Sequence, residues 1–212
     1  MDVLLSSAYL PPIQYFSKLV CGGRSFIEAH DNYTKQTYRN RCVILDANGP
    51  LALTVPTEKL DTDKCPMRDV RISEHGNWRH RHWNALEAAY RHTPFFLYYE
   101  DDFRPFYERR REFLYDFNME LTLLACDLIG IGAVPAPTES YEARPALCDL
   151  RESIHPKRPW QDDADFSPVT YYQVFKEKHG FVPNMSIVDL LFNMGPESIL
   201  VLRDSTVPKN RG

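Results

Sequence analysis

Three cations fall within seven residues of the chain, interleaved with planar and hydroxyl-bearing side chains. They are Lys35, Arg39 and Arg41, with Tyr38 and Asn40 between them. In an extended chain, successive side chains point to opposite faces, so the three cations would share one face of a strand. Like charges this close repel each other unless an anion or an acidic group lies opposite. We therefore predict that this segment binds an anion, because Arg, Asn and Tyr side chains together suit a ligand of defined shape.

Two structural explanations compete with an anion-binding site. Lys and Arg on an edge strand discourage unwanted strand pairing, so the three cations could simply be solvated. In the second explanation, Glu87 lies on one predicted helix face with Trp83 and Tyr90, and a carboxylate among aromatic side chains needs a cationic partner. The arginines would then have a structural role.

A carboxylate and a histidine lie two residues apart where a strand is predicted to end. Glu28 and His30 would share one face of that strand, and open α/β sheets bind ligands beyond the ends of their strands. A carboxylate beside an imidazole can position the ring as a general acid or base. We predict a catalytic pair of His30 and Glu28, against the alternative of a surface histidine with a chance acidic neighbour. Two histidines at i, i+4 are absent, so no metal site is predicted.

Composition excludes several classes of protein. The chain has 212 residues, and 25 basic against 29 acidic residues give a net charge of −4, which argues against a nucleic-acid partner. No apolar run approaches the roughly 20 residues that span a bilayer, and the N-terminal apolar run has no basic leader. The five cysteines show no CxxC spacing, so neither zinc nor a disulfide framework is expected. Together these features predict a cytoplasmic protein.

Strand-like and helix-like segments alternate along the chain, which predicts the α/β class. We expect a single domain over 1–212, with helices packed on a central, mostly parallel or mixed sheet. The predicted strands cover residues 3–6, 26–29, 69–72 and 171–175, and the predicted helices cover 13–20, 78–90, 103–129 and 186–192. Asn48-Gly49 predicts a β-hairpin near residues 40–55, with Pro50 favouring a longer loop.

Two further segments have particular signals. Residues 130–168 are rich in proline and poor in apolar side chains, so we expect a loop region within the domain. Ser186 is expected to cap the helix that follows it, with Asp189 in the reciprocal position of a capping box.

Four blocks of the chain, in order, resemble the WbqC-like family of bacterial proteins, over most of the length. The first is Ser7-Ala-Tyr-Leu-Pro-Pro-Ile-Gln-Tyr-Phe16. The second runs from Lys35 to Arg41 and on to Asn48-Gly49 and Val55-Pro56. The others are 78–90 with Pro94-Phe-Phe96, and 181–195. The chain departs from the family in its Pro-rich 130–168 segment, where many members have a Gly-rich, Tyr-containing segment.

The resemblance implies a role in making a bacterial surface polysaccharide of the O-antigen type. We expect a transferase or ligase that attaches an acyl or aminoacyl group to an amino sugar or sugar nucleotide. His30 and Glu28 would move the proton of the amine, and the cations would hold a diphosphate or carboxylate. The substrate-binding set would comprise Tyr9, Tyr33, Lys35, Tyr38, Arg39, Asn40 and Arg41.

The resemblance leaves other points open. No cofactor is assigned, although ATP with magnesium is expected if the donor is a free carboxylate. The expected partner is a small anionic substrate such as a sugar nucleotide, and self-association into a homo-oligomer is left open. The alternative to an enzyme is a non-catalytic component of an envelope assembly that binds a glycan or a protein partner.

Overall fold

An apolar run, a helix and a second apolar run open the chain and build the first pair of parallel strands. Strand β1 (Val3–Ser6) is followed by helix α1 (Ile13–Leu19) and strand β2 (Ser25–Glu28). Parallel neighbours need a crossover connection, which α1 supplies. The register runs from Val3 beside Ser25 to Ser6 beside Glu28, so both strands end at the same edge.

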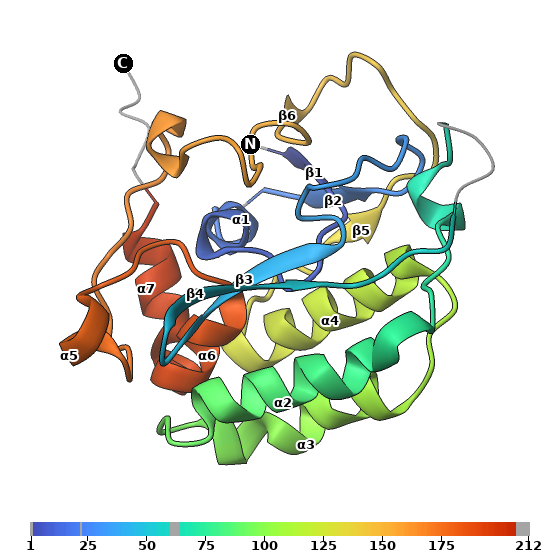
Figure 1. Ribbon diagram of the computed structural model, residues 1–212. Helices are drawn as coiled ribbons and strands as arrows, with labels where there is room; N and C mark the ends of the chain where they lie inside the picture. The colour runs from blue at the N-terminus through green and yellow to red at the C-terminus, as the bar shows by residue number, and fades with distance from the viewer. Residues whose placement is uncertain (1, 22, 60–63, 207–212) are drawn as a thin grey trace, which may run out of the picture.

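The computed structural model describes residues 2–21, 23–59 and 64–206 (Figure 1). Two short strands complete the parallel sheet in the order β5-β2-β1-β6. Strand β5 (Ala136–Pro137) lies beside β2, and β6 (Cys148–Asp149) lies beside β1, both parallel to their neighbours. The predicted α/β class with a mostly parallel sheet is confirmed. Sequence periodicity missed β5 and β6 because each has only two residues.

The predicted hairpin is confirmed, with a tighter turn than expected. Strands β3 (Arg41–Asp46) and β4 (Gly49–Thr54) are antiparallel and form a separate two-stranded sheet. Asp46 pairs with Gly49, so the loop has two residues, and Gly49 takes a φ of +109° that favours glycine. Pro50 lies opposite Leu45 instead of lengthening the loop.

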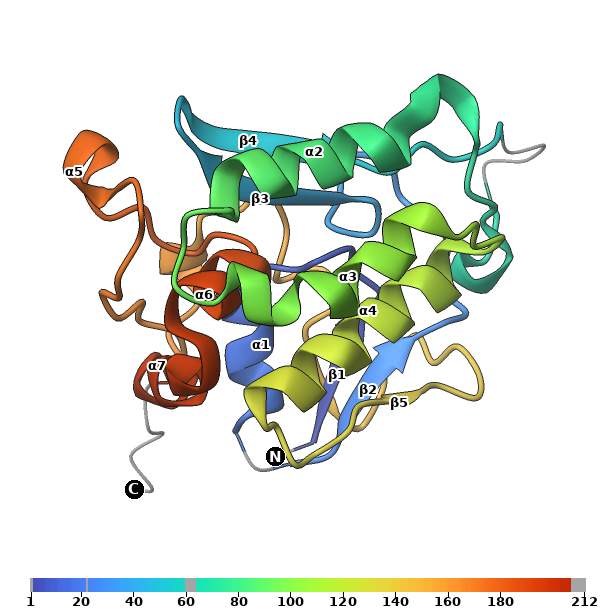
Figure 2. The ribbon, with the colours of Figure 1, turned by 90° about the horizontal axis from the view of Figure 1, so that it is seen from below.

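The longer helices gather on one side of the sheet. Helices α2 (Trp78–Tyr90), α3 (Phe96–Glu108) and α4 (Leu114–Ile129) run next to one another, and α2 also packs on β3 (Figure 2). The predicted helical region 103–129 is interrupted at 109–113, between α3 and α4. The interruption does not lie at Pro105, which is inside α3. In the described residues, no helix combines the length and the apolar character needed to cross a membrane.

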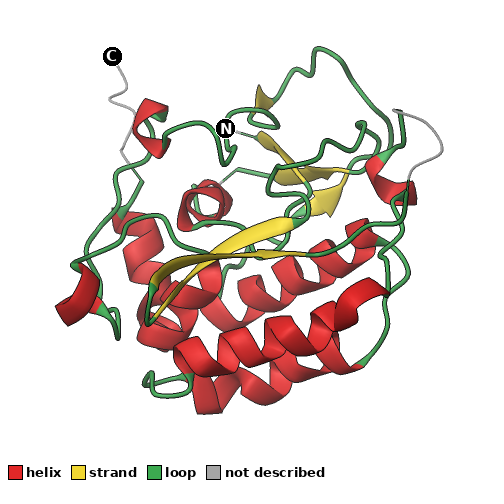
Figure 3. Cartoon of the chain, viewed as in Figure 1, coloured by secondary structure: helices red, strands yellow, loops and turns green. Residues whose placement is uncertain are grey.

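The remaining elements are short. Helices α5 (Lys176–His179), α6 (Ile187–Met194) and α7 (Ser198–Asp204) follow the sheet in the chain. Single 3-10 turns cover Met67–Asp69, His75–Asn77, Trp160–Asp162 and Gly195–Glu197. Figure 3 shows that loops, rather than helices, connect most of the segments beyond β5 up to α6.

Helix α6 packs on helices α2 and α3 through one aromatic side chain. The Phe192 ring centroid lies 5.3 Å from that of Tyr90, 5.1 Å from that of Phe96 and 5.3 Å from that of Phe103. These rings are almost completely buried, and tilted or edge-on pairs at such distances are favourable. The C-terminal block is therefore part of the core.

Two predicted strands are absent because other contacts replace strand pairing. Residues 69–72 form only isolated bridges, in which Arg71 pairs with Phe113 and Ile72 with Thr57. Residues 171–175 contain no strand. There, the Gln173 side chain accepts a hydrogen bond from the Val182 N–H at 2.9 Å and donates one to its carbonyl at 2.9 Å. A side-chain amide thus performs the pairing that a neighbouring strand would provide.

Asp189 has a different role from the predicted capping box. Its buried carboxylate accepts hydrogen bonds from the Tyr90 hydroxyl, the Tyr171 hydroxyl and the Gln173 amide. Ser186 precedes α6 as predicted, but its hydroxyl donates to the carbonyl of Leu10. Burial raises the pKa of Asp189 to about 6. The carboxylate therefore connects α2 and the 171–173 segment to α6.

We expect Tyr171→Phe to lower the free energy of unfolding by about 1–3 kcal/mol, because it removes one donor from a buried carboxylate. The neighbouring Tyr172 is 51% exposed, so Tyr172→Phe should change stability by no more than about 0.5 kcal/mol. Urea unfolding of both variants measures the difference. Equal effects would show that the Asp189 network does not stabilise the fold.

Candidate functional site at the carboxyl ends of the parallel strands

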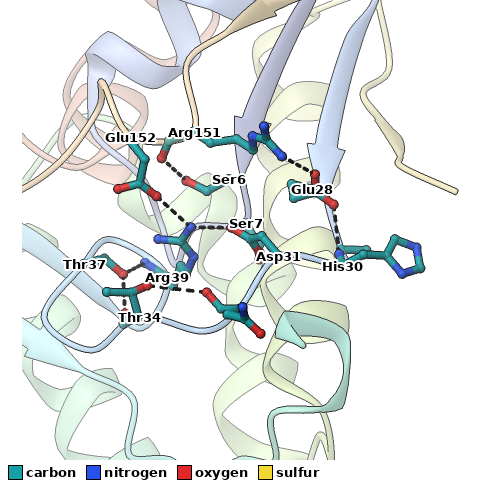
Figure 4. Close-up of polar contacts among 12 residues, drawn as sticks. Ser6, Ser7, Glu28, His30, Asp31, Thr34, Thr37, Arg39, Arg151 and Glu152 are labelled. Atoms are coloured by element: carbon teal, nitrogen blue, oxygen red, sulfur yellow. Dashed lines mark hydrogen bonds and ion pairs between the residues drawn. The ribbon is translucent and has the colours of Figure 1, made fainter. Parts of the chain in front are cut away.

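The carboxyl ends of all four parallel strands meet at one edge of the sheet. Polar or charged residues end or follow each strand there, and Figure 4 shows those at β1, β2 and β6. They are Ser6 at the end of β1 and Ser7 after it, Glu28 at the end of β2 with His30 and Asp31 after it, Thr138 after β5, and Arg151 and Glu152 after β6. Open parallel sheets bind ligands at this edge, so these side chains form the candidate site.

A completely buried carboxylate lies at the centre of this edge. One oxygen of Glu28 is 2.8 Å from Nη1 of Arg151, and neither side chain is more than 7% exposed. The Arg151 guanidinium also contacts Asp149 at 2.7 Å, and this hydrogen bonding raises the pKa of Arg151 and lowers the pKa of Asp149. A buried carboxylate without a counter-charge is strongly destabilising, so Glu28 needs the guanidinium of Arg151 as its counter-charge.

The second oxygen of Glu28 positions two neighbouring segments. Its Oε1 accepts hydrogen bonds from the backbone N–H of His30 at 2.9 Å and from the Thr138 hydroxyl at 2.8 Å. The predicted proximity of His30 and Glu28 is therefore present, but the carboxylate contacts the backbone of His30, not its ring. Glu28 acts on His30 by fixing the chain around it.

The imidazole of His30 has a different partner, which assigns its tautomer. Nε2 lies 3.1 Å from the carbonyl oxygen of Thr138. A carbonyl oxygen can only accept a hydrogen bond, so Nε2 carries the proton. In the neutral ring Nδ1 is then the proton-accepting atom. The half-buried His30 therefore has Nδ1 as the acceptor atom of its ring.

The cationic segment does not form an extended strand. Residues 35–39 contain turns and bends, and Gln36 has a φ of +60°, which breaks the expected alternation of side chains. Lys35 is exposed, Arg39 is buried, and Arg41 is half-buried at the start of β3 with its Nε 3.3 Å from the Thr54 hydroxyl. The three cations therefore do not share one face.

Arg39 is already neutralised within the chain. Its Nη2 pairs with the carboxylate of Asp31 and lies 3.4 Å from that of Glu152, while the Arg39 side chain is 3% exposed. At the place where the sequence predicted a bound anion, carboxylates of the same chain lie opposite this guanidinium. The structural explanation applies to Arg39, with Asp31 as the carboxylate instead of Glu87. Burial raises the pKa of Asp31, and the adjacent Arg39 opposes that increase.

Several buried polar atoms around Arg39 have no partner among the described residues. They are Oδ1 of Asp31, Nε of Arg39 and Oδ1 of Asn118. The Asn118 amide connects them to the end of β1, because it donates to the Ser7 hydroxyl at 3.0 Å and to the Arg39 carbonyl at 2.7 Å. Unpaired buried polar atoms cost stability, and native proteins keep few of them. This edge of the sheet therefore has more buried polar atoms than the hydrogen bonds of the described residues satisfy.

The predicted tyrosines and asparagine lie farther inside the fold. The Tyr9 hydroxyl is 2.9 Å from Nδ1 of His82 and 2.9 Å from the Tyr107 hydroxyl, all within the core. Burial lowers the pKa of His82 to about 4, so this imidazole is neutral near pH 7. The Asn40 amide donates to the carbonyl of Val55 at 2.9 Å. Tyr33 is buried and Tyr38 is half-buried, so both side chains pack within the fold.

Two cavities adjoin the site on either side of the end of β5, where Pro137 and Thr138 line both. The first has a volume of about 350 Å³ and contains His30, and the second has a volume of about 470 Å³ and contains Glu28. Both volumes suit small ligands. The His30 cavity is also lined by Ala29, Arg68, Asp69, Phe113, Tyr115 and Asp116.

Sequence reasoning missed Asp31, Thr138 and Arg151. Asp31 lies eight residues before Arg39, and that spacing of opposite charges was a usable signal. Thr138 and Arg151 lie in the Pro-rich segment that was predicted to be only a loop. Arg151 is 123 residues from Glu28 in the chain, and no local pattern could connect them.

Comparison with known proteins confirms the resemblance found in the sequence. The model of the WbqC-like protein family matches residues 6–146 and 161–201. The chain is 27% identical to "Uncharacterized protein Rv1507c" of Mycobacterium tuberculosis (strain ATCC 25618 / H37Rv), over 94% of this chain and 96% of that protein. No solved structure matches the chain.

We expect Arg39→Ala to lower the free energy of unfolding by about 3–5 kcal/mol, because it leaves Asp31 buried without its counter-charge. Arg41→Ala is the matched control and should cost no more than about 1 kcal/mol, because this side chain is half-buried. Chemical denaturation without added ligand measures both. Wild-type stability for Arg39→Ala would show that the Asp31 pair is not structural.

Proposed function

We propose that this chain, which belongs to the WbqC-like protein family, is an enzyme of bacterial surface-polysaccharide biosynthesis. The proposed reaction transfers an acyl or aminoacyl group to the amine of an amino sugar or sugar nucleotide. The observation that carries this proposal is the His30 ring, held at Nε2 by the Thr138 carbonyl and placed in a cavity at the carboxyl edge of the sheet.

The proposed step needs a base at the attacking amine. The amine nitrogen attacks the carbonyl carbon of an activated acyl donor, such as a thioester or an acyl phosphate, and a new C–N bond forms. Nδ1 of His30 accepts the proton that the amine loses. The bond from the carbonyl carbon to the leaving group breaks, and the leaving group departs with the electron pair and receives that proton. A free carboxylic acid as donor would require activation by ATP with magnesium.

The lining of the His30 cavity suits the acceptor. Asp69 and Asp116 supply carboxylates that bind amines and sugar hydroxyls, and Arg68, whose Nε lies 3.8 Å from Asp69, supplies an exposed cation for a phosphate. Lys35 and Arg41 remain proposed contacts for the anionic part of the substrate, because in the described part of the chain neither is in an ion pair. Glu28 and Arg151 are proposed to position His30 and Thr138.

One observation favours a non-catalytic role as the second candidate. The deepest charges of the site neutralise each other, since Glu28 pairs with Arg151 and Asp31 pairs with Arg39. A protein that binds a glycan or a partner in an envelope assembly would need only such a rigid framework and the outer cavities. It would bind the sugar without consuming an acyl donor.

We expect His30→Ala to lower the rate of acyl transfer by about 10²–10⁴-fold, because it removes the proton acceptor. His92→Ala, which alters an exposed histidine outside both cavities, is the control and should keep full activity. Mass spectrometry of amino sugars and nucleotide-linked amino sugars, incubated with thioester donors or with carboxylic acids plus ATP and magnesium, measures product formation. Sugar binding in a thermal-shift assay without any product would support the non-catalytic role.

A further inference from the structure

The 470 Å³ cavity lies over a face of the sheet that is covered by a loop. Its floor includes Leu4 of β1 and Phe26 of β2, and Glu28 lies on the same face because side chains alternate along a strand. Residues 138–147, the covering segment, run over this face between β5 and β6, and Figure 3 shows them as loop. The helices α2 to α4 gather on the other side of the sheet (Figure 2).

The covering segment is fastened near its start and again near its middle. Its first residue, Thr138, is bonded to Glu28 and His30 as described above. Farther along, Nη2 of Arg151 donates to the carbonyl of Glu142 at 2.9 Å, and the guanidinium lies 5.0 Å from the centre of the Tyr141 ring. These contacts hold the covering segment in place above the cavity.

The lining combines apolar surface with two exposed glutamates, Glu139 and Glu142. The apolar lining residues are Leu4, Phe26, Ala136, Pro137, Pro145, Ala146 and Leu147. The single arginine of the lining, Arg24, is already paired with Asp2, at 2.9 Å from Nε and 2.7 Å from Nη2. Glu28 is neutralised by Arg151. The exposed Glu139 and Glu142 therefore determine the sign of the charge that a ligand meets.

We propose that this cavity binds the aminoacyl group of the donor, with its apolar side chain over Leu4 and Phe26 and its ammonium beside Glu139 and Glu142. This inference rests on the proposed function and narrows it from any acyl group to an aminoacyl group. An apolar side chain gains by leaving water, and the two glutamates attract a cation and repel a carboxylate. A plain acyl chain would use only the apolar part of the lining.

The position of the cavity fits the proposed transfer. Pro137 and Thr138 line both this cavity and the His30 cavity, so the two cavities adjoin at these residues. The carboxyl end of the aminoacyl group would lie toward Thr138 and Glu28. The amine of the acceptor would then be close to Nδ1 of His30.

Three amides separate the contributions of charge and apolar surface. L-Leucinamide carries both an ammonium and an isobutyl group, 4-methylpentanamide lacks the amine, and glycinamide lacks the isobutyl group. Titration calorimetry with the full chain should show that L-leucinamide binds about fivefold more tightly than 4-methylpentanamide. It should also bind at least about tenfold more tightly than glycinamide. Equal binding of the first two amides would overturn the assignment of the ammonium.

Tryptophan and glutamine substitutions test whether L-leucinamide binds in this cavity. Ala146→Trp fills it and should abolish L-leucinamide binding, whereas Ala143→Trp, an exposed position in the same segment outside the lining, should not. Combined Glu139→Gln and Glu142→Gln should remove the preference for the amine, and Glu177→Gln on α5 is the charge control. Unchanged binding by Ala146→Trp would overturn the proposal.

Failure of this inference is distinguishable from failure of the proposed function. L-Leucinamide binding that depends on Ala146 and the two glutamates, without any product, would support the cavity assignment and contradict the transferase. Product formation from plain acyl thioesters, without L-leucinamide binding, would support the transferase and overturn the aminoacyl assignment.

Discussion

The site depends on a single buried ion pair, that between Glu28 and Arg151. The Glu28 side chain is 0% exposed, and a charge in that position is tolerated only with a counter-charge and further hydrogen bonds. Arg151 provides the charge, while the His30 backbone and the Thr138 hydroxyl provide the hydrogen bonds. One carboxylate thus joins the ends of β2 and β5 to the segment after β6. It thereby adds to the backbone hydrogen bonds that hold the two short strands β5 and β6 in the sheet.

This arrangement separates the charges that form buried ion pairs from the imidazole of His30. Arg39 and Arg151, the most buried arginines of the site, balance Asp31 and Glu28 and hold the loops in place. His30 takes no part in these ion pairs, and its Nε2 is bonded only to a neutral carbonyl. Its Nδ1 is therefore available at a wall of a cavity whose framework is already electrostatically satisfied. That is the preorganisation expected of a site in which a base must keep one orientation.

Elements with a complete local pattern could be predicted from the sequence, and contacts between distant residues could not. The apolar run 3–5, the periodic helix 78–90 and the hairpin each carry their signal within a few residues. The spacing of Lys35, Arg39 and Arg41 gave a false strand because nothing in their alternation reveals the left-handed Gln36. The Glu28–Arg151 pair has no local signature at all. The expectation that strand ends carry the site therefore selected His30 and Glu28, but it did not reveal which residues contact them.

The Pro-rich segment explains how this edge of the sheet differs from the helical side. Proline lacks an N–H and disfavours helix, and with Pro137 before them and Pro145 among them, residues 138–147 cover the Phe26 face as an irregular chain. A helix would pack its side chains closely on Leu4 and Phe26, whereas this segment leaves 470 Å³ above them. Among the described residues, the hydrogen bonds and the cation–π contact that fasten it involve Thr138, Tyr141 and Glu142. The shape of this cavity can therefore change through the rest of the covering segment while the buried ion pair and the core remain intact.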